Sequence, residues 1–452
     1  MTKDLGTEKQ SCVQRSFTAF RMTGLSKLFS EATMNLRNMT LYSIFIRNHG
    51  GTFAAVEQDL PRIRALGVDA IWLMPIHPIG EVKRKGTLGS PYAIKDYRGI
   101  NPEFGTMDGF VQLCATAHKL GLKVLIDVVY HHTSPDSVLV KTHPEYFYRR
   151  ADGSFGNHVG EWTDIIDLDF SVPALWDELI DTLCFWARYV DGFRCDVAPL
   201  VPLGFWKEAR KRVAAVRPGC IWLAESVEHG FIRYNRNQGL FALSDSELYQ
   251  AFDICYDYDV YGDFMAYVQG RETLAEYVAA LERQESIYPS DYVKLRFTEN
   301  HDRLRTAFLF PDRTVRETWI AWTFFQKGMP MLYSGQEWAV NHTPTLFDAD
   351  PIPMDGEPMH ERLLQTLIAV KKDALFSDGV YTLEARARDV IVSTWTMGSR
   401  KAVGVFSLRG NAAAVSVPLA DGRYRNILND REYPVDYGTV STAGEPIIVI
   451  VQ

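Results

Sequence analysis

Short apolar runs alternate with amphipathic segments through most of the chain, from about residue 40 to residue 374. The runs are too short for helices and rich in β-branched residues, which is typical of buried parallel strands. Segments with a helical pattern separate them, as at 53–66, 107–120 and 203–217. This alternation predicts an α/β fold of the (β/α)8 TIM-barrel type. The predicted strands lie at residues 41–46, 69–74, 123–129, 190–196, 220–225, 251–257, 292–297 and 329–335.

The pattern changes at about residue 375. Segments such as KAVGVFSL and EPIIVIVQ alternate apolar and polar residues and are separated by Gly, Asn and Asp. They predict an antiparallel β-domain of the sandwich type at 375–452. Residues 1–35 fit neither pattern and are interpreted as an N-terminal extension. The barrel is therefore assigned to 36–374, with a short insertion at about 133–168 after the strand at 123–129.

Composition restricts the possible partners and the cellular compartment of the protein. The chain has 452 residues, a net charge of −8 and scattered Lys and Arg residues, which gives no indication of a nucleic-acid partner. No stretch approaches the roughly 18 apolar residues of a membrane span, and the N-terminus has no apolar signal region. The six cysteines show no metal-ligand spacing, so we interpret them as buried thiols of a cytoplasmic protein. The sequence does not indicate an oligomeric state.

Charged residues stand at the ends of four predicted strands. In such barrels the chemistry lies at the carboxyl ends of the strands. A single charged strand end is as well explained by a structural salt bridge, but four that converge on one face indicate a catalytic site. The residues concerned are Asp127, Arg194, Asp196, Glu225, His301 and Asp302.

Three carboxylates of these residues, Asp196, Glu225 and Asp302, would share one partly desolvated site, where each affects the ionisation of the others. Their pKa values are expected to separate, which gives one ionised nucleophile and one protonated acid. Retaining glycosidases use such a pair about 5 Å apart. An aromatic content of 12% is consistent with a sugar-binding cleft, because flat rings cover the apolar face of a pyranose.

At these positions the sequence resembles the α-amylase family of retaining glycoside hydrolases. Four segments are similar to the family's motifs and occur in its order: DVVYHH (127–132), GFRCD (192–196), LAES (223–226) and FTENHD (297–302). Supporting matches are WLMP (72–75), SPYAIKDY (90–97), IDLD (166–169) and GMPMLYSGQE (328–337). The resemblance covers nearly the whole barrel.

The resemblance implies a role for each matching residue. Asp196 would be the nucleophile, Glu225 the general acid/base, and Asp302 the carboxylate that orients the sugar hydroxyls. Arg194 would favour the ionised form of Asp196. Tyr92 would stack beneath the sugar, and His132 and His301 would hydrogen-bond to it. We expect Asp127 to hold loops at the barrel mouth, and His77 and His131 to be core residues.

Departures from the family pattern concern calcium. Many members carry Asn before the histidine of the DVVYHH motif and Lys-His after the nucleophile, and these help to bind a structural Ca²⁺. This chain has His131, Pro199 and Leu200 there. Their side chains do not supply the hard oxygen ligands that calcium prefers. The sequence therefore predicts that the calcium site is missing and that neither a metal nor an organic cofactor is used.

Substrate preference is indicated by two neighbours of site residues. Members that act on chain ends often carry Asp after the stacking tyrosine, so Ala93 favours an open cleft. Val197 instead resembles the residue found in some α-1,6-acting glucosidases. We predict an α-glucan hydrolase that cleaves α-1,4 bonds of malto-oligosaccharides by double displacement, with transglycosylation possible from the same intermediate. The alternatives are an exo-acting or α-1,6-acting α-glucosidase, or a non-catalytic carbohydrate binder, against which the intact carboxylates argue.

Overall fold

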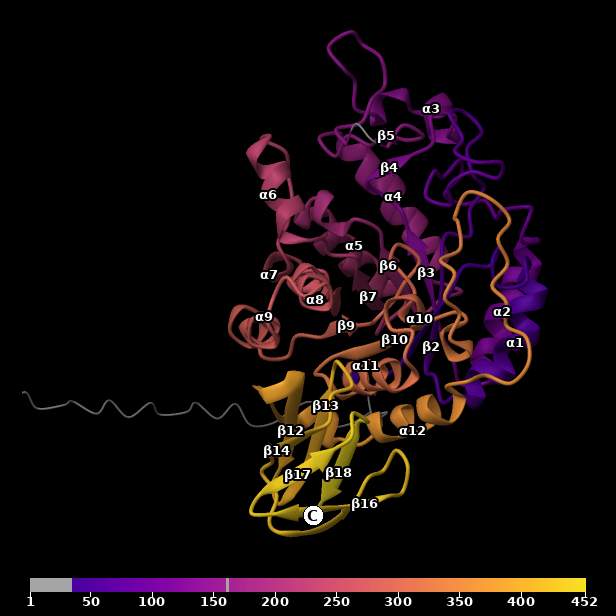
Figure 1. Cartoon of the computed structure of the whole chain (residues 1–452). Coiled ribbons are helices and arrows are strands. Elements are labelled where there is room, and N and C mark those ends of the chain that lie inside the picture. Colours follow the sequence, from indigo (N-terminus) through magenta and orange to yellow (C-terminus); the bar gives the residue numbers. More distant parts are fainter. Residues whose placement is uncertain (1–34, 160–161) are drawn as a thin grey trace, which may run out of the picture. The chain divides into compact units, whose positions relative to one another are not determined.

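The computed structural model describes residues 35–159 and 162–452. In this part of the chain eight parallel strands close into a barrel, in the order β1-β10-β9-β8-β7-β6-β3-β2. The predicted TIM-barrel fold is thereby confirmed. Figure 1 labels the barrel strands β2, β3, β6, β7, β9 and β10. The barrel strands are β1 (Leu41–Ile44), β2 (Ala70–Leu73), β3 (Lys123–Val128), β6 (Gly192–Cys195), β7 (Ile221–Ala224), β8 (Ile254–Tyr256), β9 (Lys294–Arg296) and β10 (Met329–Tyr333).

Helices follow the barrel strands along the chain, and several begin at residues that stabilise a helix start. Thr52 and Thr106 accept hydrogen bonds from the first turns of α1 and α2, and Thr273 forms a reciprocal capping box with Glu276 at α9. The longer helices are α1 (Phe53–Ala65), α2 (Met107–Lys119), α4 (Pro173–Trp186), α5 (Leu203–Val216), α6 (His229–Asn237), α8 (Tyr261–Val268), α9 (Leu274–Ile287), α11 (Arg313–Phe325) and α12 (Glu361–Lys371). Shorter ones are α3 (Val138–Thr142), α7 (Asp245–Leu248), α10 (Thr306–Leu309) and α13 (Leu375–Asp378).

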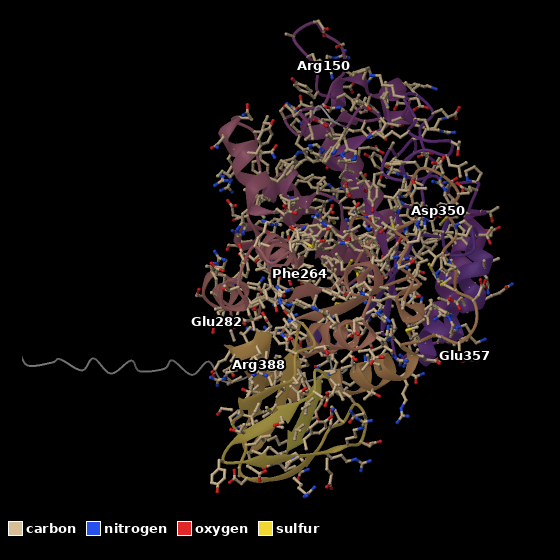
Figure 2. The ribbon with its side chains drawn as sticks, viewed as in Figure 1. Arg150, Phe264, Glu282, Asp350, Glu357 and Arg388 are labelled. Atoms are coloured by element: carbon tan, nitrogen blue, oxygen red, sulfur yellow. The ribbon has the colours of Figure 1, made fainter. Side chains whose placement is uncertain are left out.

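The predicted C-terminal β-domain is present as two antiparallel four-stranded sheets, in the orders β11-β12-β13-β18 and β14-β17-β16-β15. Tryptophans fix the first sheet to α11, because Trp395 donates to the carbonyl of Phe325 and Trp319 donates to that of Leu408. Phe264, labelled in Figure 2, packs on Trp319 with ring centroids 5.1 Å apart. The strands are β11 (Val380–Arg386), β12 (Val390–Met397), β13 (Arg400–Ser407), β14 (Ala413–Ser416), β15 (Gly422–Arg425), β16 (Glu432–Asp436), β17 (Thr439–Thr442) and β18 (Ile447–Val451).

The insertion after β3 contains α3 and a two-stranded antiparallel sheet of β4 (His132–Thr133) and β5 (Ile166–Asp167). It brings His132 and the segment around residue 164 to the mouth of the barrel. The predicted N-terminal extension lies, except for residue 35, outside the described residues. None of the helices in the described ranges combines the length and apolar character needed to cross a bilayer.

Candidate active site

The register of three neighbouring strands brings the predicted nucleophile and acid/base together. Asp127 on β3 is paired with Arg194 on β6, and Cys195 on β6 is paired with Ala224 on β7. Asp196 and Glu225 are the next residues of β6 and β7, at their carboxyl ends. Their backbones continue the ladder, since the Asp196 amide donates to Val128 and that of Glu225 to Cys195. Both side chains therefore start from adjacent points on the barrel rim.

Arg194 is the centre of the charged cluster and is fully buried. Its Nη1 donates to both oxygens of Asp127, at 2.9 and 3.1 Å, and to Oδ1 of Asp196 at 2.8 Å. Its Nη2 lies 2.9 Å from Oε1 of Glu225, without the alignment of a hydrogen bond, so this contact is an ion pair. One guanidinium group thus contacts three carboxylates.

Asp127 is structural, as expected, but it lies below the barrel mouth. It is completely buried on the floor of the site, where it binds Arg194. The hydroxyl of Tyr92 also donates to it, at 3.3 Å. Its carboxylate faces the barrel interior, since it contacts the fully buried Arg194 guanidinium group. Asp127 therefore positions Arg194 and Tyr92.

Tyr92, His301 and Asp302 form a second group beside the charged cluster. The rings of Tyr92 and His301 are stacked, with an angle of 18° between their planes, and the tyrosine hydroxyl lies 2.7 Å from Nε2 of the histidine. The same nitrogen lies 3.1 Å from a carboxylate oxygen of Asp302. These contacts connect Tyr92, on the loop after β2, to His301 and Asp302, on the loop after β9.

A cavity of about 430 Å³ opens above these residues. Five of the seven predicted site residues line it: Tyr92, His132, Asp196, Glu225 and Asp302. The other two, Arg194 and His301, contact lining residues, since Arg194 donates to Asp196 and His301 lies 2.7 Å from the Tyr92 hydroxyl. Trp162, Tyr258 and Arg303 also line it and are not singled out by the sequence motifs. The complete lining is Lys85, Ser90, Tyr92, His132, Trp162, Asp164, Ile165, Asp196, Val197, Glu225, Tyr258, Asp302, Arg303, Leu346 and Phe347.

Val197 is a further site residue, through its backbone. It follows the predicted nucleophile and has left-handed dihedral angles, φ 34° and ψ 44°, which are unfavourable for a β-branched residue. In this conformation its N–H donates to Oε2 of Glu225 at 2.8 Å. The strained turn thus connects the predicted nucleophile to the predicted acid/base.

Ionisation of the three carboxylates differs from the expected pattern. Burial raises the pKa of Asp196 and that of Glu225 to about 7 each, although the Arg194 guanidinium opposes the rise. Desolvation also disfavours the charged form of Asp302, but neighbouring His301 and Arg194 outweigh it and lower its pKa to about 2. Arg194 contacts both Asp196 and Glu225, so it does not hold Asp196 alone in the ionised form. Of the three carboxylates, Asp302 is the one whose pKa differs from the other two, and it is lower.

These values predict a pH profile. The predicted roles of nucleophile and general acid require Asp196 without its proton and Glu225 with its proton. Below about pH 7 Asp196 gains a proton, and above about pH 7 Glu225 loses one, so kcat/KM should be bell-shaped with a maximum near pH 7. Initial rates with maltoheptaose across pH 4–10 measure it. An α-maltosyl fluoride needs no acid, so the rate of its glycosylation step should not fall at alkaline pH. An optimum below pH 5 with maltoheptaose would contradict these assignments.

His77 and His131 are both buried, as expected of core residues. The Nδ1 of His77 lies 3.0 Å from the carbonyl of Gly99, and burial lowers its pKa to about 4. The Nδ1 atoms of His131 and His132 lie 3.1 Å apart, so one donates to the other. Burial also lowers the pKa of His132, to about 3, which leaves a neutral ring in the cavity wall.

Known proteins share this architecture. A family model described as the α-amylase catalytic domain matches residues 15–150, and one described as the bacterial α-amylase C-terminal domain matches residues 382–449. The crystal structure of an α-amylase from Lactobacillus plantarum is 48% identical, covers 93% of this chain and 100% of that one, and superposes with a TM-score of 0.91. The chain belongs to the α-amylase family.

Other relatives of this α-amylase family enzyme differ in named activity. The maltogenic α-amylase AmyB from Thermotoga neapolitana is 35% identical over 92% of this chain and 99% of that chain, with a TM-score of 0.84. An α-1,4-glucan:maltose-1-phosphate maltosyltransferase from Rhodospirillum rubrum is 35% identical over 55% of this chain. The match spans only 36% of that protein's length. Family membership thus includes both hydrolysis and glycosyl transfer.

Proposed function

We propose that this enzyme is a retaining hydrolase of α-1,4-glucans that cleaves malto-oligosaccharides and starch fragments by double displacement. The proposal rests on the contact of the Arg194 guanidinium group with both Asp196 and Glu225. This arrangement favours the short carboxyl separation of about 5 Å that retaining enzymes use over the 6.5–9.5 Å of inverting ones. The stacked Tyr92 and the Asp302 carboxylate beside it supply a place for the sugar that is attacked.

In the first step Asp196 attacks the anomeric carbon while Glu225 donates its proton to the glycosidic oxygen. The bond between that carbon and the leaving oxygen breaks, and a β-glucosyl ester forms on Asp196. Arg194 compensates the negative charge of Asp196 before the attack. The Val197 N–H holds Oε2 of Glu225 on the side of the nucleophile.

In the second step Glu225, now ionised, takes a proton from water, which attacks the same carbon and releases Asp196. The product has the α configuration of the substrate, because two inversions have occurred. A sugar hydroxyl that replaces water completes a glycosyl transfer instead. Hydrolysis and transfer therefore differ only in the acceptor of the second step.

The family's structural calcium does not fit the residues at its position here. Asp167 has one buried oxygen without a hydrogen-bond partner, and its other oxygen accepts from the N–H of His158. Beside it lie the rings of His131 and His158, which supply nitrogen rather than oxygen. Ca²⁺ takes six to eight oxygen ligands. No group of three or more His, Cys, Asp or Glu side chains in the described ranges is arranged to hold a metal ion.

We therefore expect activity without calcium. Products from maltoheptaose should appear at the same rate, within about twofold, in buffer with a chelator and in buffer with added Ca²⁺. Timed chromatography of the products measures this and tests the proposed reaction as well. Loss of activity on chelation that added calcium restores would contradict the calcium argument. A complete lack of turnover under both conditions would contradict the proposed function.

A further inference from the structure

Three loops join along one side of the active-site cavity. The loop after β2 carries Lys85, the insertion after β3 carries Asp164, and the loop after β10 carries Phe347; all three side chains line the cavity. Lys85 Nζ forms an ion pair of 3.0 Å with Asp164, whose side chain is only 6% exposed. The same ammonium group lies 6.0 Å from the centre of the Phe347 ring. We call these three residues the wall.

The wall is held by a dense set of contacts between the loops after β2 and β10. The N–H of Leu88 donates to the carbonyl of Phe347 at 2.9 Å, and Thr87 donates through both its N–H and its hydroxyl to Asp348. Gly86 has a φ of +60°, and a side chain there would collide with the backbone and Cβ of Phe347. The two loops are thus in direct contact, with no space between them for a glucan chain.

The side chains of Arg47 and Asp350 bind the backbone of the loops that carry the wall. Arg47, which follows β1, donates to the carbonyls of Gly89 and Leu346 and forms an ion pair with Glu103. Asp350, labelled in Figure 2, accepts a hydrogen bond from the N–H of Thr345 at 2.9 Å. These contacts fix both ends of the segment that presents Phe347. The wall is therefore a built part of the site.

Barrel order shows which end of the substrate meets the wall. β7, which Glu225 directly follows, lies across the barrel from β1, and β2 and β10 are the two neighbours of β1. The acid/base contacts the glycosidic oxygen, so the leaving group extends beyond Glu225. The sugars on the non-reducing side of the cleaved bond therefore extend away from Glu225, toward Lys85 and Phe347.

We propose that the wall closes the non-reducing side of the cleft and binds the non-reducing terminal glucose of an α-1,4-glucan. The Lys85–Asp164 pair offers a donor and an acceptor to its hydroxyls, and Phe347 offers an apolar surface. The enzyme then removes short units, glucose and maltose, from chain ends instead of cutting within chains. This inference rests on the proposed function, and it differs from the open cleft that Ala93 indicates.

Two forms of one substrate test the wall: p-nitrophenyl α-maltoheptaoside with a free non-reducing end, and the same compound with that end blocked by an ethylidene group. The wild-type enzyme should prefer the free form in kcat/KM by at least about tenfold. Early labelled products should be shortened by one or two glucose units. The double variant Lys85→Ala/Asp164→Ala removes both charges at once and should reduce the preference to about twofold. Phe347→Ala provides a second, independent opening of the wall.

The matched control is Lys211→Ala/Glu208→Ala, which removes an exposed ion pair on α5 far from the cavity and should keep the wild-type preference. Equal cleavage of blocked and free substrate by the wild-type enzyme, with products of all lengths, would overturn the wall and leave the proposed function intact. An unchanged preference in both opened variants would also overturn it. Failure of the wild-type enzyme to cleave either substrate would contradict the proposed function itself.

Discussion

Replacement of Asp196 with Asn is expected to lower kcat for maltoheptaose by roughly 10⁴-fold or more, as loss of a nucleophile does in other covalent mechanisms. The amide cannot form the glucosyl ester. It can still accept the hydrogen bond that Arg194 now donates to Oδ1 at 2.8 Å, so the fold should be retained. Steady-state kinetics together with a thermal unfolding curve measure both effects.

The control for this variant is Asp355→Asn, which makes the same chemical change at an exposed position that does not line the cavity. It should keep wild-type kcat within about twofold. Asp196→Asn with more than a tenth of wild-type activity would show that Asp196 is not the nucleophile. A large fall in unfolding temperature in Asp196→Asn alone would assign the loss to folding instead of chemistry.

Glu225→Gln is expected to lower kcat for maltoheptaose by roughly 10²–10⁴-fold, the usual contribution of a general acid/base. The amide can still accept the Val197 N–H, so the turn after Asp196 should persist. Binding should be retained, because the sugar's contacts with Tyr92 and Asp302 are untouched. Calorimetric titration with maltoheptaose and kinetics on the same preparation separate the two properties.

An activated substrate distinguishes loss of acid catalysis from general damage. An α-maltosyl fluoride needs no proton from Glu225, so its first step in Glu225→Gln should proceed within about tenfold of the wild-type rate. Glu208→Gln on α5, where the glutamate side chain is 43% exposed, is the matched control and should behave like the wild type with both substrates. Equal losses with the fluoride and with maltoheptaose would contradict an acid/base role.

The architecture of the barrel could be predicted because its signal is local. The apolar runs at 41–46 and 123–129 are too short for helices, and in the structure they form β1 and β3. The ends of β6 and β7 could also be predicted, because a charged residue follows each strand where it stops. Asp196 and Glu225 follow β6 and β7 directly, so parallel pairing alone brings them to one rim.

The contacts of Arg194 could not be predicted, because they depend on how one side chain crosses the barrel. The sequence places Arg194 beside Asp196, but its simultaneous contacts with Asp127 and Glu225 come from the register of three strands. The left-handed turn at Val197 has no sequence signal either, since valine is disfavoured there. Glu337, the last residue of the GMPMLYSGQE segment, accepts a buried hydrogen bond from Tyr42 and forms an ion pair with Arg62.

The wall illustrates the limit of motif-based interpretation. Ala93 indicates an open cleft through the absence of one polar side chain. Lys85 and Phe347 are separated by more than 250 positions in the sequence, and neither belongs to a motif. They meet because β2 and β10 both flank β1, and loop contacts of this kind are visible only in three dimensions.

The proposed mechanism passes through a covalent glucosyl ester on Asp196, and mass spectrometry detects such an ester directly. Glu225→Gln lacks the base that activates water, so incubation with α-maltosyl fluoride should accumulate the intermediate. The intact protein should gain the mass of one maltosyl group, and peptide mapping should place that group on Asp196. A protein that turns over the fluoride without gaining mass, or that carries the sugar on another residue, would contradict the account.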